Sequence, residues 1–476
     1  MRRISSVSEL LELSRDAGIK SITPRVAYIA KTEEEVALAV KEATAGGLSV
    51  TARGGGTGIP SQSIGEGAIL IQDRVSAVLG EGFVRCQPGI VKAELNKVLS
   101  AAGRWMPIDP SSYASCTVGG MVANNSSGAR TAKYGSTIDY VTELRIVHPW
   151  GEKEAIRPVP SDVALSSEKR TRKVASLIVE NQSAIANERP KVTKNSSGYR
   201  LEKVLHDDIV DLPKLFTGSE GTLGVITEMT FSTRDPPRTR LLLVAESTLQ
   251  DLQETVGALR ALAPAALELV DKSVFRKTDS WEKVASYSRS EDPFLIFCEL
   301  DGEEEELASK IEEAAGAISE FDPLVITGQA EISDAWDTRN QTLNLAQEIR
   351  KGAKVAVPGV EDLVVPPRRL GDLIRLLVDQ FEKRGLEYIL YGHAGDANLH
   401  ARPILDPTDT RTLEGLMDDC FEAVWKMGGS MTGEHGDGML RARYVERQYP
   451  RTYWIMKELK EVYDPKRILN PGVKVS

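Results

Sequence analysis

The chain is poor in histidine and cysteine, and it has no long apolar run. Only five of its 476 residues are histidines and four are cysteines. The cysteines are widely spaced and form no CxxC pair, which argues against an iron–sulfur cluster and fits a reducing compartment. No apolar stretch reaches the roughly 18 residues that a membrane span needs. The first residues form an amphipathic pattern and not a signal-peptide core, so we expect a cytoplasmic protein.

The chain also lacks an excess of positive charge. It has 59 Lys and Arg residues against 69 Asp and Glu residues, which gives a net charge of −10 and a pI near 5.4. Nucleic acid is therefore not an expected partner. The length predicts two to four domains, with enough chain to bury a large core.

Three of the five histidines are concentrated in the last part of the chain, namely His393, His400 and His435. The residues before His393 read as a strand, and Gly395-Asp396 is a turn pair. A two-residue hairpin turn at this pair would place His393 opposite Asn398. Because side chains alternate between faces, His400 would lie on the face of His393, with Cβ atoms roughly 7 Å apart or less.

Two imidazoles at this separation can bind one divalent metal ion through bonds of about 2.0–2.1 Å. Glu434 would complete the ligand set, and the neighbouring His435 would serve as a base. Zinc and manganese both suit two histidines and a carboxylate. Histidines that are purely structural remain the alternative, since a one-residue slip of the hairpin register would separate the pair.

A glycine-rich loop follows a predicted strand near the N-terminus. Residues 48–53 (LSVTAR) read as the strand, and residues 54–58 (GGGTG) form the loop. Glycines allow backbone N–H groups to approach phosphate oxygens, and Arg53 adds positive charge. The loop matches neither the GxGxxG dinucleotide motif nor a Walker A loop, and a plain glycine turn is the alternative.

Residues 107–141 are rich in Gly, Ser, Asn and Thr and show little amphipathic pattern. Within a compact domain, such a segment is either disordered or wrapped around something. Because predicted strands flank it, we expect it to bind an extended ligand through backbone amides and small hydroxyls, and residues 191–200 and 217–227 repeat this chemistry. After a linker at 233–239, alternating strands and helices predict an antiparallel sheet covered by helices.

Six motifs, taken in order, resemble the FAD-linked 2-hydroxyacid dehydrogenases of the vanillyl-alcohol oxidase superfamily. They are RGGGTG, TVGGMVANNSSG followed by YG, TGSEGTLGVIT, GHAGDANLH, GEHGDG and DPKRILNPG. The resemblance runs from about residue 20 to the C-terminus. It implies an α+β fold with a PCMH-type FAD-binding domain at 1–236, an α/β cap domain with an antiparallel sheet at 237–425, and a C-terminal segment at 426–476 that returns to the FAD domain.

The resemblance also implies site residues, position by position. The FAD-binding positions are matched by Arg53, Gly54, Gly55, Gly56, Thr57, Gly58, Ser115, Thr117, Gly119, Gly120, Asn125, Gly128, Gly221, Ile226 and Asn470. The metal ligands are matched by His393, His400 and Glu434, the catalytic base by His435, and substrate-side positions by Arg339 and Asn398. No His or Cys occupies the loop position used for covalent flavin attachment, which implies non-covalent FAD.

The implied reaction is the oxidation of a D-2-hydroxy acid to the 2-oxo acid. D-lactate is the first expectation for the substrate, with glycolate and D-2-hydroxyglutarate as alternatives. A divalent metal, zinc or manganese, would assist deprotonation of the hydroxyl group, and hydride would pass to the flavin N5. Electrons would then pass to a separate acceptor: a quinone, a cytochrome, an electron-transfer flavoprotein or an iron–sulfur subunit. A membrane-bound partner of this kind would allow a peripheral location at the membrane.

Other interpretations stay open from the sequence. The chain would also suit a flavin subunit that is active only within a multi-subunit glycolate or lactate oxidase complex. An alkylglycerone-phosphate-synthase-like flavoenzyme is a second alternative, and a metallohydrolase that uses the same three ligands is a third. A homodimer is compatible with each of them.

Overall fold

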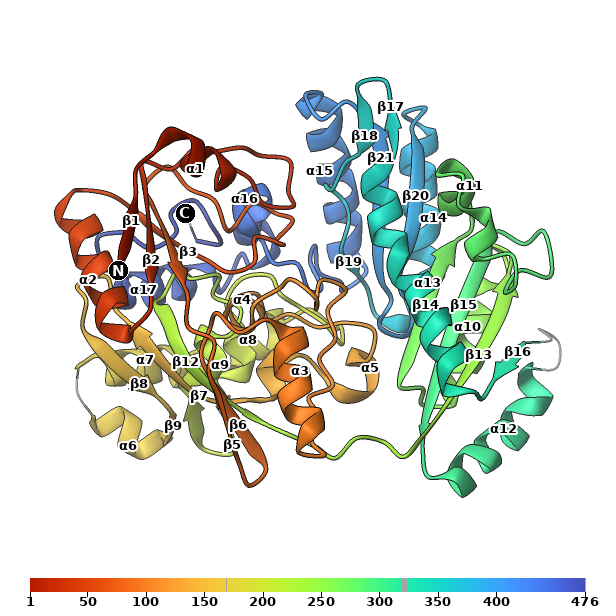
Figure 1. The fold of residues 1–476 in the computed structure, drawn as a ribbon, viewed down its shortest axis with the longest axis horizontal. Coiled ribbons are helices and arrows are strands. Elements are labelled where there is room, and N and C mark those ends of the chain that lie inside the picture. The colour runs from red at the N-terminus through yellow and green to blue at the C-terminus, as the bar shows by residue number, and fades with distance from the viewer. Residues whose placement is uncertain (168, 319–322, 476) are drawn as a thin grey trace.

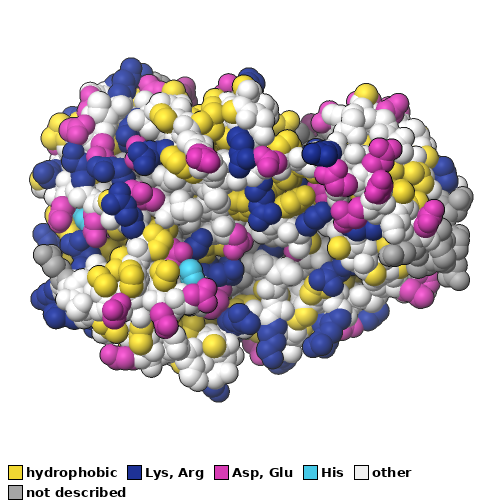
Figure 2. Space-filling view, turned by 90° about the horizontal axis from the view of Figure 1, so that it is seen from below, with side chains coloured by type: hydrophobic (Ala, Val, Ile, Leu, Met, Phe, Trp, Pro, Cys, Tyr) yellow, Lys and Arg dark blue, Asp and Glu magenta, His cyan; other side chains and the backbone are white. Residues whose placement is uncertain are grey.

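The computed structural model describes residues 1–167, 169–318 and 323–475. Figure 1 shows a larger part that contains both chain termini and a smaller part built on one large sheet. On the face drawn in Figure 2, Lys and Arg side chains are interspersed with Asp and Glu side chains. No helix in the described part of the chain combines the length and apolarity of a membrane span.

The N-terminal sheet of the larger part carries the glycine loop. Its strand order is β1-β2-β4-β3, and β4 pairs in parallel with both β2 and β3. The strands are β1 (Arg2–Ile4), β2 (Val26–Ala30), β3 (Val50–Arg53) and β4 (Ala68–Gln72). Helix α2 (Glu33–Ala45) begins after Thr32, whose side chain accepts a hydrogen bond from Glu35 N, as expected for an N-cap. The strand predicted at 48–53 and the loop that leaves it are confirmed.

A second, five-stranded sheet completes the larger part, in the order β5-β6-β12-β7-β8. Its strands are β5 (Ala77–Gly80), β6 (Phe83–Cys86), β7 (Val141–Val147), β8 (Lys153–Ile156) and β12 (Val225–Ser232). A small sheet is formed by β9 (Pro158–Pro160), β10 (Leu205–His206) and β11 (Ile209–Asp211). The helices in this part are α1 (Val7–Glu12), α3 (Lys92–Ala101), α6 (Ser161–Ser166), α7 (Lys169–Glu180), α8 (Gln182–Glu188) and α9 (Leu212–Phe216).

Residues 107–141, in which the sequence shows little amphipathic pattern, contain short helices. This segment contains α4 (Val118–Asn124), α5 (Thr131–Tyr134) and a 3-10 turn at Thr137–Asp139. The side chain of Thr117 caps α4 by accepting a hydrogen bond from Gly120 N. The helix has only seven residues and two of them are glycines, so its short apolar face does not produce a readable periodic pattern.

The smaller part is built on a nine-stranded antiparallel sheet, in the order β16-β13-β15-β14-β20-β21-β18-β17, with β19 also paired to β21. This confirms the antiparallel sheet predicted from the sequence. Its strands are β13 (Thr239–Ser247), β14 (Ala266–Asp271), β15 (Phe294–Gly302), β16 (Leu324–Ile326), β17 (Arg350–Lys351), β18 (Lys354–Ala356), β19 (Leu363–Val364), β20 (Glu387–His393) and β21 (Asn398–Leu405).

Helices cover both faces of this sheet. Alternate residues of β13 belong to two hydrophobic clusters: Leu241 and Leu243 to one, Leu242 and Val244 to the other. The first cluster includes α10 (Leu252–Ala261), α12 (Glu304–Ile318), α14 (Leu370–Glu382) and α15 (Thr410–Lys426), and it continues into the larger part. The second includes α11 (Ser273–Lys277) and α13 (Gln329–Glu348). Burial on both faces explains the unbroken apolar run of β13.

The chain returns to the larger part after α15. Helices α16 (Gly438–Gln448) and α17 (Tyr453–Tyr463) lie beside the N-terminal elements in Figure 1. Val50 N in β3 donates a hydrogen bond to Ile468 O, and Asn470 N donates one to Val50 O. Lys460 Nζ donates to Thr222 O over 2.7 Å. The loop before α16, which carries Glu434 and His435, is thereby placed between the two parts.

Candidate functional site

The first cavity lies in the larger part, at the ends of β3 and β4. It is lined by the glycine loop, by the N-terminal turn of α4 and by the loop before β12. Eleven of the fifteen residues predicted to bind FAD line this cavity, namely Arg53, Gly54, Gly55, Gly56, Thr57, Gly58, Thr117, Gly119, Gly120, Gly221 and Ile226.

The glycines of this cavity are required because two backbone segments meet there. A Cβ atom on Gly54 would lie 2.4 Å from Thr117 Oγ1, and one on Gly55 would lie 2.3 Å from Ser115 O. Gly56 has a φ of 69°, a left-handed conformation that glycine adopts without penalty. The glycine loop and the start of α4 therefore form a cradle of exposed backbone, which fits a cofactor that carries phosphates.

The other four predicted FAD residues do not line this cavity. The Ser115 backbone touches Gly55, and Gly128 lines a second cavity instead. Asn125, with a φ of 53°, accepts a hydrogen bond from Ile138 N, and Asn470 donates to Gln62 O and Glu220 O. In this structure, these two asparagines hold neighbouring loops together.

Arg53 is placed differently from the expectation. It lines the first cavity, but its guanidinium donates hydrogen bonds to Arg15 O over 2.8 Å and to Ser63 O over 3.1 Å. These contacts are with backbone carbonyls of the chain itself. Arg53 therefore joins the glycine loop to its neighbouring segments, and the backbone supplies the cradle.

The second cavity, of about 430 Å³, lies against the large sheet. Its wall includes His393 and His400 from the hairpin, and Trp336 from α13. Glu434 and His435 line this cavity and also the first one. The loop that carries these two residues therefore forms the junction between the two cavities.

The histidine hairpin has the predicted register. His393, at the end of β20, pairs with Asn398, and Tyr391 pairs with His400. The predicted two-residue turn was wrong, however: residues 394–397 form a 3-10 turn in which Ala397 N donates to Ala394 O. Ala397 has a φ of 51°, a conformation that the sequence does not signal at an alanine.

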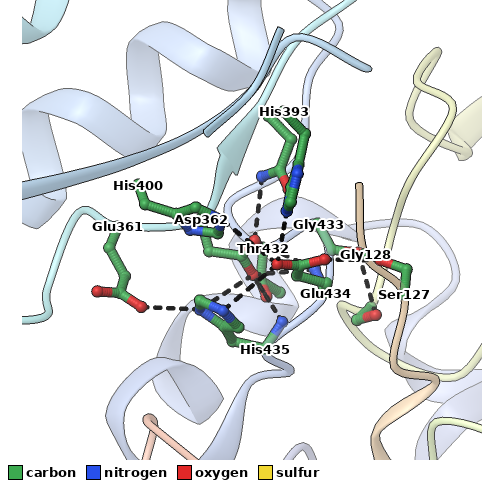
Figure 3. Close-up of polar contacts among 12 residues, drawn as sticks. Ser127, Gly128, Glu361, Asp362, His393, His400, Thr432, Gly433, Glu434 and His435 are labelled. Atoms are coloured by element: carbon green, nitrogen blue, oxygen red, sulfur yellow. Dashed lines mark hydrogen bonds and ion pairs between the residues drawn. The ribbon is translucent and has the colours of Figure 1, made fainter. Parts of the chain in front are cut away.

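The two hairpin histidines converge on one carboxylate oxygen. Glu434 Oε1 lies 3.1 Å from His393 Nε2 and 3.3 Å from His400 Nε2 (Figure 3). In a tetrahedral zinc site with bonds of about 2.0–2.1 Å, ligand atoms are about 3.3 Å apart. Both histidines are buried. The three predicted ligands thus meet at one carboxylate oxygen, and two imidazoles and a carboxylate are ligand types that suit a divalent metal. Among the described residues, the compact group of candidate ligand atoms holds His400 and Glu434 together with Asp362 and His435, and it does not include His393.

Glu268 orients the first of these histidines. Its two carboxylate oxygens lie 2.7 and 2.9 Å from His393 Nδ1, on the side of the ring that faces away from Glu434. A carboxylate behind a metal-binding histidine fixes the ring and raises its basicity. Glu268 also forms an ion pair with Arg339. Arg339 lines the second cavity as expected for a substrate-side residue, but it is buried and already paired.

Asp362 holds the loop of Glu434 and His435. One of its carboxylate oxygens, Oδ2, accepts hydrogen bonds from Glu434 N over 3.0 Å and from His435 N over 2.8 Å, and the Thr432 hydroxyl donates to it as well. Asp362 lies within the same cluster of metal-ligand atom types as His400, Glu434 and His435. Since these donors occupy Oδ2, we infer that Asp362 positions the loop of Glu434 and His435 and does not bind a metal.

Asn398 belongs to this loop support as well. Its amide donates to Asp362 Oδ1 over 3.0 Å and to Leu363 O over 3.2 Å, and it is fully buried. Among the described residues, it is not part of the second cavity's wall. The structure therefore places this predicted substrate residue behind the site.

His435 is oriented by a further buried acid. Its Nδ1 lies 2.8 Å from Glu361 Oε1, and Glu361 also pairs with Arg402. This leaves His435 Nε2, 3.6 Å from Glu434 Oε1, on the side of the metal ligands. Glu361 and Asp362 were not among the residues predicted from the sequence. Two adjacent acids that enter an apolar strand were the available signal.

Buried carboxylates give the three histidines different pKa values. Burial disfavours protonation of His393, but Glu268 outweighs it and raises the pKa of His393 to about 9. Burial lowers the pKa of His400. Burial opposes ionisation of Glu434, but Lys194 and His393 hold its pKa well below the usual range. The pKa of His435 is raised, because Asp362 and Glu361 outweigh burial.

Two family models match this chain. Residues 24–156 match a family model described as an FAD binding domain. Residues 235–473, half of the chain, match the model of the C-terminal domain of FAD linked oxidases. The chain belongs to the FAD-linked oxidase family. The predicted family is thereby confirmed, and the match includes an FAD-binding domain.

This FAD-linked oxidase resembles two groups of curated relatives. It is 30% identical over 471 residues to a D-lactate dehydrogenase of Anaerostipes hadrus, with 94% of this chain and 89% of the relative covered. It is 29% identical over 518 residues to the D-2-hydroxyglutarate dehydrogenase of Escherichia coli, with 98% of this chain but 50% of the relative covered. The chain thus spans about half the length of that second relative.

A solved structure confirms the predicted fold of the FAD-linked oxidase. The p-cresol methylhydroxylase structure with substrate bound superposes with a TM-score of 0.69 at 14% identity, covering 99% of this chain and 93% of that one. This likeness establishes the PCMH-type architecture. At this low identity, the likeness supports the fold and nothing further.

Proposed function

We propose that this chain oxidises a D-2-hydroxy acid to the 2-oxo acid in an FAD-dependent reaction. One observation carries the proposal: the FAD cavity and the cavity with the histidines meet at Glu434 and His435. D-lactate is the first candidate substrate, because a D-lactate dehydrogenase matches along most of both chains. Glycolate and D-2-hydroxyglutarate are the alternatives.

Each residue of the site has a separate role in this proposal. When bound, non-covalent FAD would accept two electrons from the substrate, and a divalent metal, zinc or manganese, would lower the pKa of the substrate hydroxyl. His393, His400 and Glu434 would hold the metal, with Glu268 fixing the first ring. His435 accepts the hydroxyl proton at Nε2, because its Nδ1 is held by Glu361.

His435 must be neutral to accept this proton. In the protein alone, Asp362 and Glu361 raise its pKa. A divalent cation held beside it would lower that pKa by charge repulsion. Metal and base are therefore coupled, and the acids behind His435 keep its ring oriented in either protonation state.

The electrons would leave through a separate acceptor. We infer a quinone, a cytochrome, an electron-transfer flavoprotein or an iron–sulfur subunit, since the four cysteines of the chain are buried, free and far apart in sequence. Turnover assays with each acceptor class, after reduction by the substrate, would identify it.

The visible spectrum of the purified protein under anaerobic conditions tests the proposal. We expect a flavin spectrum that bleaches on addition of D-lactate, and L-lactate, glycolate and D-2-hydroxyglutarate would then rank the substrates. A flavin that no 2-hydroxy acid bleaches would favour a subunit that needs its complex, or a synthase-like reaction without net oxidation. A protein that holds no flavin and cannot be reconstituted with FAD would overturn the proposal.

A further inference from the structure

Lys194 is a fully buried cation beside the candidate metal site. It comes from the polar segment 191–200 of the larger part. Its Nζ lies 3.0 Å from Gly128 O, 3.2 Å from Glu434 Oε2 and 3.6 Å from Asp396 Oδ2. Because a buried ammonium without partners is costly, these contacts fix the position of the lysine side chain.

The two carboxylate oxygens of Glu434 have different surroundings. Oε2 accepts a hydrogen bond from the Ser127 hydroxyl over 2.8 Å and another from Lys194. Oε1 faces the imidazoles of His393 and His400. Figure 3 shows this arrangement, with Ser127 on one side of Glu434 and the histidines on the other.

We propose that Lys194 and Ser127 are positioning residues that make Glu434 a one-oxygen ligand of the metal. They hold Oε2, so that only Oε1 is presented to the ion. A carboxylate held in this way occupies one coordination position and leaves another open for substrate oxygens. The inference rests on the proposed metal-assisted function and deepens it.

Lys194 also joins three segments that are distant in sequence. Gly128 belongs to the wall of the second cavity, Asp396 to the turn that follows His393, and Glu434 to the loop before α16. Asp396 is held from a second side by the Thr193 hydroxyl, over 2.6 Å. The lysine therefore couples the orientation of the histidine hairpin to that of Glu434.

Metal affinity measured without substrate tests this inference. Residues that hold metal ligands in place typically change affinity by about 10–100-fold when they are replaced. We expect Lys194→Met to lower Mn²⁺ affinity by about that factor, and Lys194→Arg, which keeps the charge, to recover part of the loss. Ser127→Ala removes one hydrogen bond to Oε2 and should lower the affinity by roughly 3- to 10-fold.

The protein is used metal-free but loaded with FAD. Free Mn²⁺ is followed by electron paramagnetic resonance during the titration, which the flavin absorbance does not disturb. The zinc K-edge X-ray absorption spectrum then counts the nitrogen and oxygen neighbours together near 2.0–2.2 Å. We expect one more such neighbour in Lys194→Met combined with Ser127→Ala than in the wild type. Lys191→Met, an exposed lysine of the same segment, is the matched control and should leave both readouts unchanged.

Unchanged Mn²⁺ affinity and an unchanged zinc spectrum in folded Lys194→Met would overturn the inference. Unchanged affinity in Ser127→Ala would do the same, even where Lys194→Met does not fold. A wild-type protein that binds no divalent metal would overturn the metal step of the proposed function as well. Because substrate is absent from these titrations, failure of the proposed oxidation is detected separately, by the flavin spectrum.

Discussion

Single residues determine what each histidine of the site can do. His393 is backed by Glu268 and His435 by Glu361, whereas His400 Nδ1 has no hydrogen-bond partner among the described residues. An imidazole whose Nδ1 faces a carboxylate keeps one ring orientation and one tautomer. The structure thus fixes the rings of His393 and His435 through carboxylates and leaves His400 Nδ1 without such a partner among the described residues.

Replacing Glu268 by glutamine tests the first of these roles. The amide removes the negative charge behind His393 and leaves Arg339 without its ion pair. We expect Mn²⁺ affinity to fall by about 10–100-fold, as for other residues that orient metal ligands. Glu387→Gln, an exposed residue at the start of β20, is the control. Equal affinities in the two variants would refute the role of Glu268.

The buried residue Lys92, which lies outside the site, should make the stability of the protein depend on pH. Burial lowers its pKa to about 8, below the ordinary value near 10.5. Between these two values the unfolded chain binds more protons than the folded one, so stability rises with pH across this window. Lys92→Met should flatten that rise, which amounts to at most about 3 kcal/mol. Melting temperatures measured between pH 7.5 and 10.5 decide this, and a parallel rise in wild type and variant would contradict the assignment.

At the scale of elements, strand pairing is easier to predict from the sequence than turn conformation. A turn centred on Gly395-Asp396 is enough to pair His393 with Asn398, although the turn has another conformation than the one predicted. The left-handed conformation of Ala397 could not be predicted, because it is imposed by the packing of the turn and not by the residue type. Helix α4 was missed for a similar reason: Thr117 and the backbone around it stabilise a helix that has too few residues to show a period.

The turn itself can be tested at Ala397. A β-branched residue is strained at positive φ, and this position is fully buried. Ala397→Val should therefore destabilise the protein by about 1–3 kcal/mol and lower metal affinity by separating His393 from His400. Ala397→Gly, which accepts this φ, should keep both properties near wild type. Thermal melting and Mn²⁺ titration report them, and a fully wild-type Ala397→Val would disprove the argument.

At the scale of the whole molecule, the site is assembled from both parts of the chain. The FAD cavity belongs to the larger part, and the histidine hairpin belongs to the large sheet. The motifs predicted the fold and the pairing of the histidine hairpin. They did not reveal Glu268, which meets His393 across 125 residues, or Lys194, which meets Glu434 across 240. Contacts at such separations depend on how the parts pack, which local patterns do not encode.

This assembly predicts that metal and flavin can be removed separately. Of the three candidate metal ligands, Glu434 lines the first cavity, together with His435, and the two hairpin histidines do not. Treatment with a chelator should leave the flavin absorbance unchanged and abolish its bleaching by substrate. Added Zn²⁺ or Mn²⁺ should restore the bleaching. Loss of FAD together with the metal would show that the two sites are not independent.

The most direct test of the account is the rate of anaerobic flavin reduction in a single turnover, compared between wild type and His435→Ala. We predict that His435→Ala binds FAD normally and reduces it about 10²–10⁴-fold more slowly, since a general base typically contributes that factor. His206→Ala, a partly exposed histidine of the small sheet, should reduce its flavin at the wild-type rate. Unimpaired reduction in His435→Ala would contradict the claim that the loop between the two cavities carries the catalytic base.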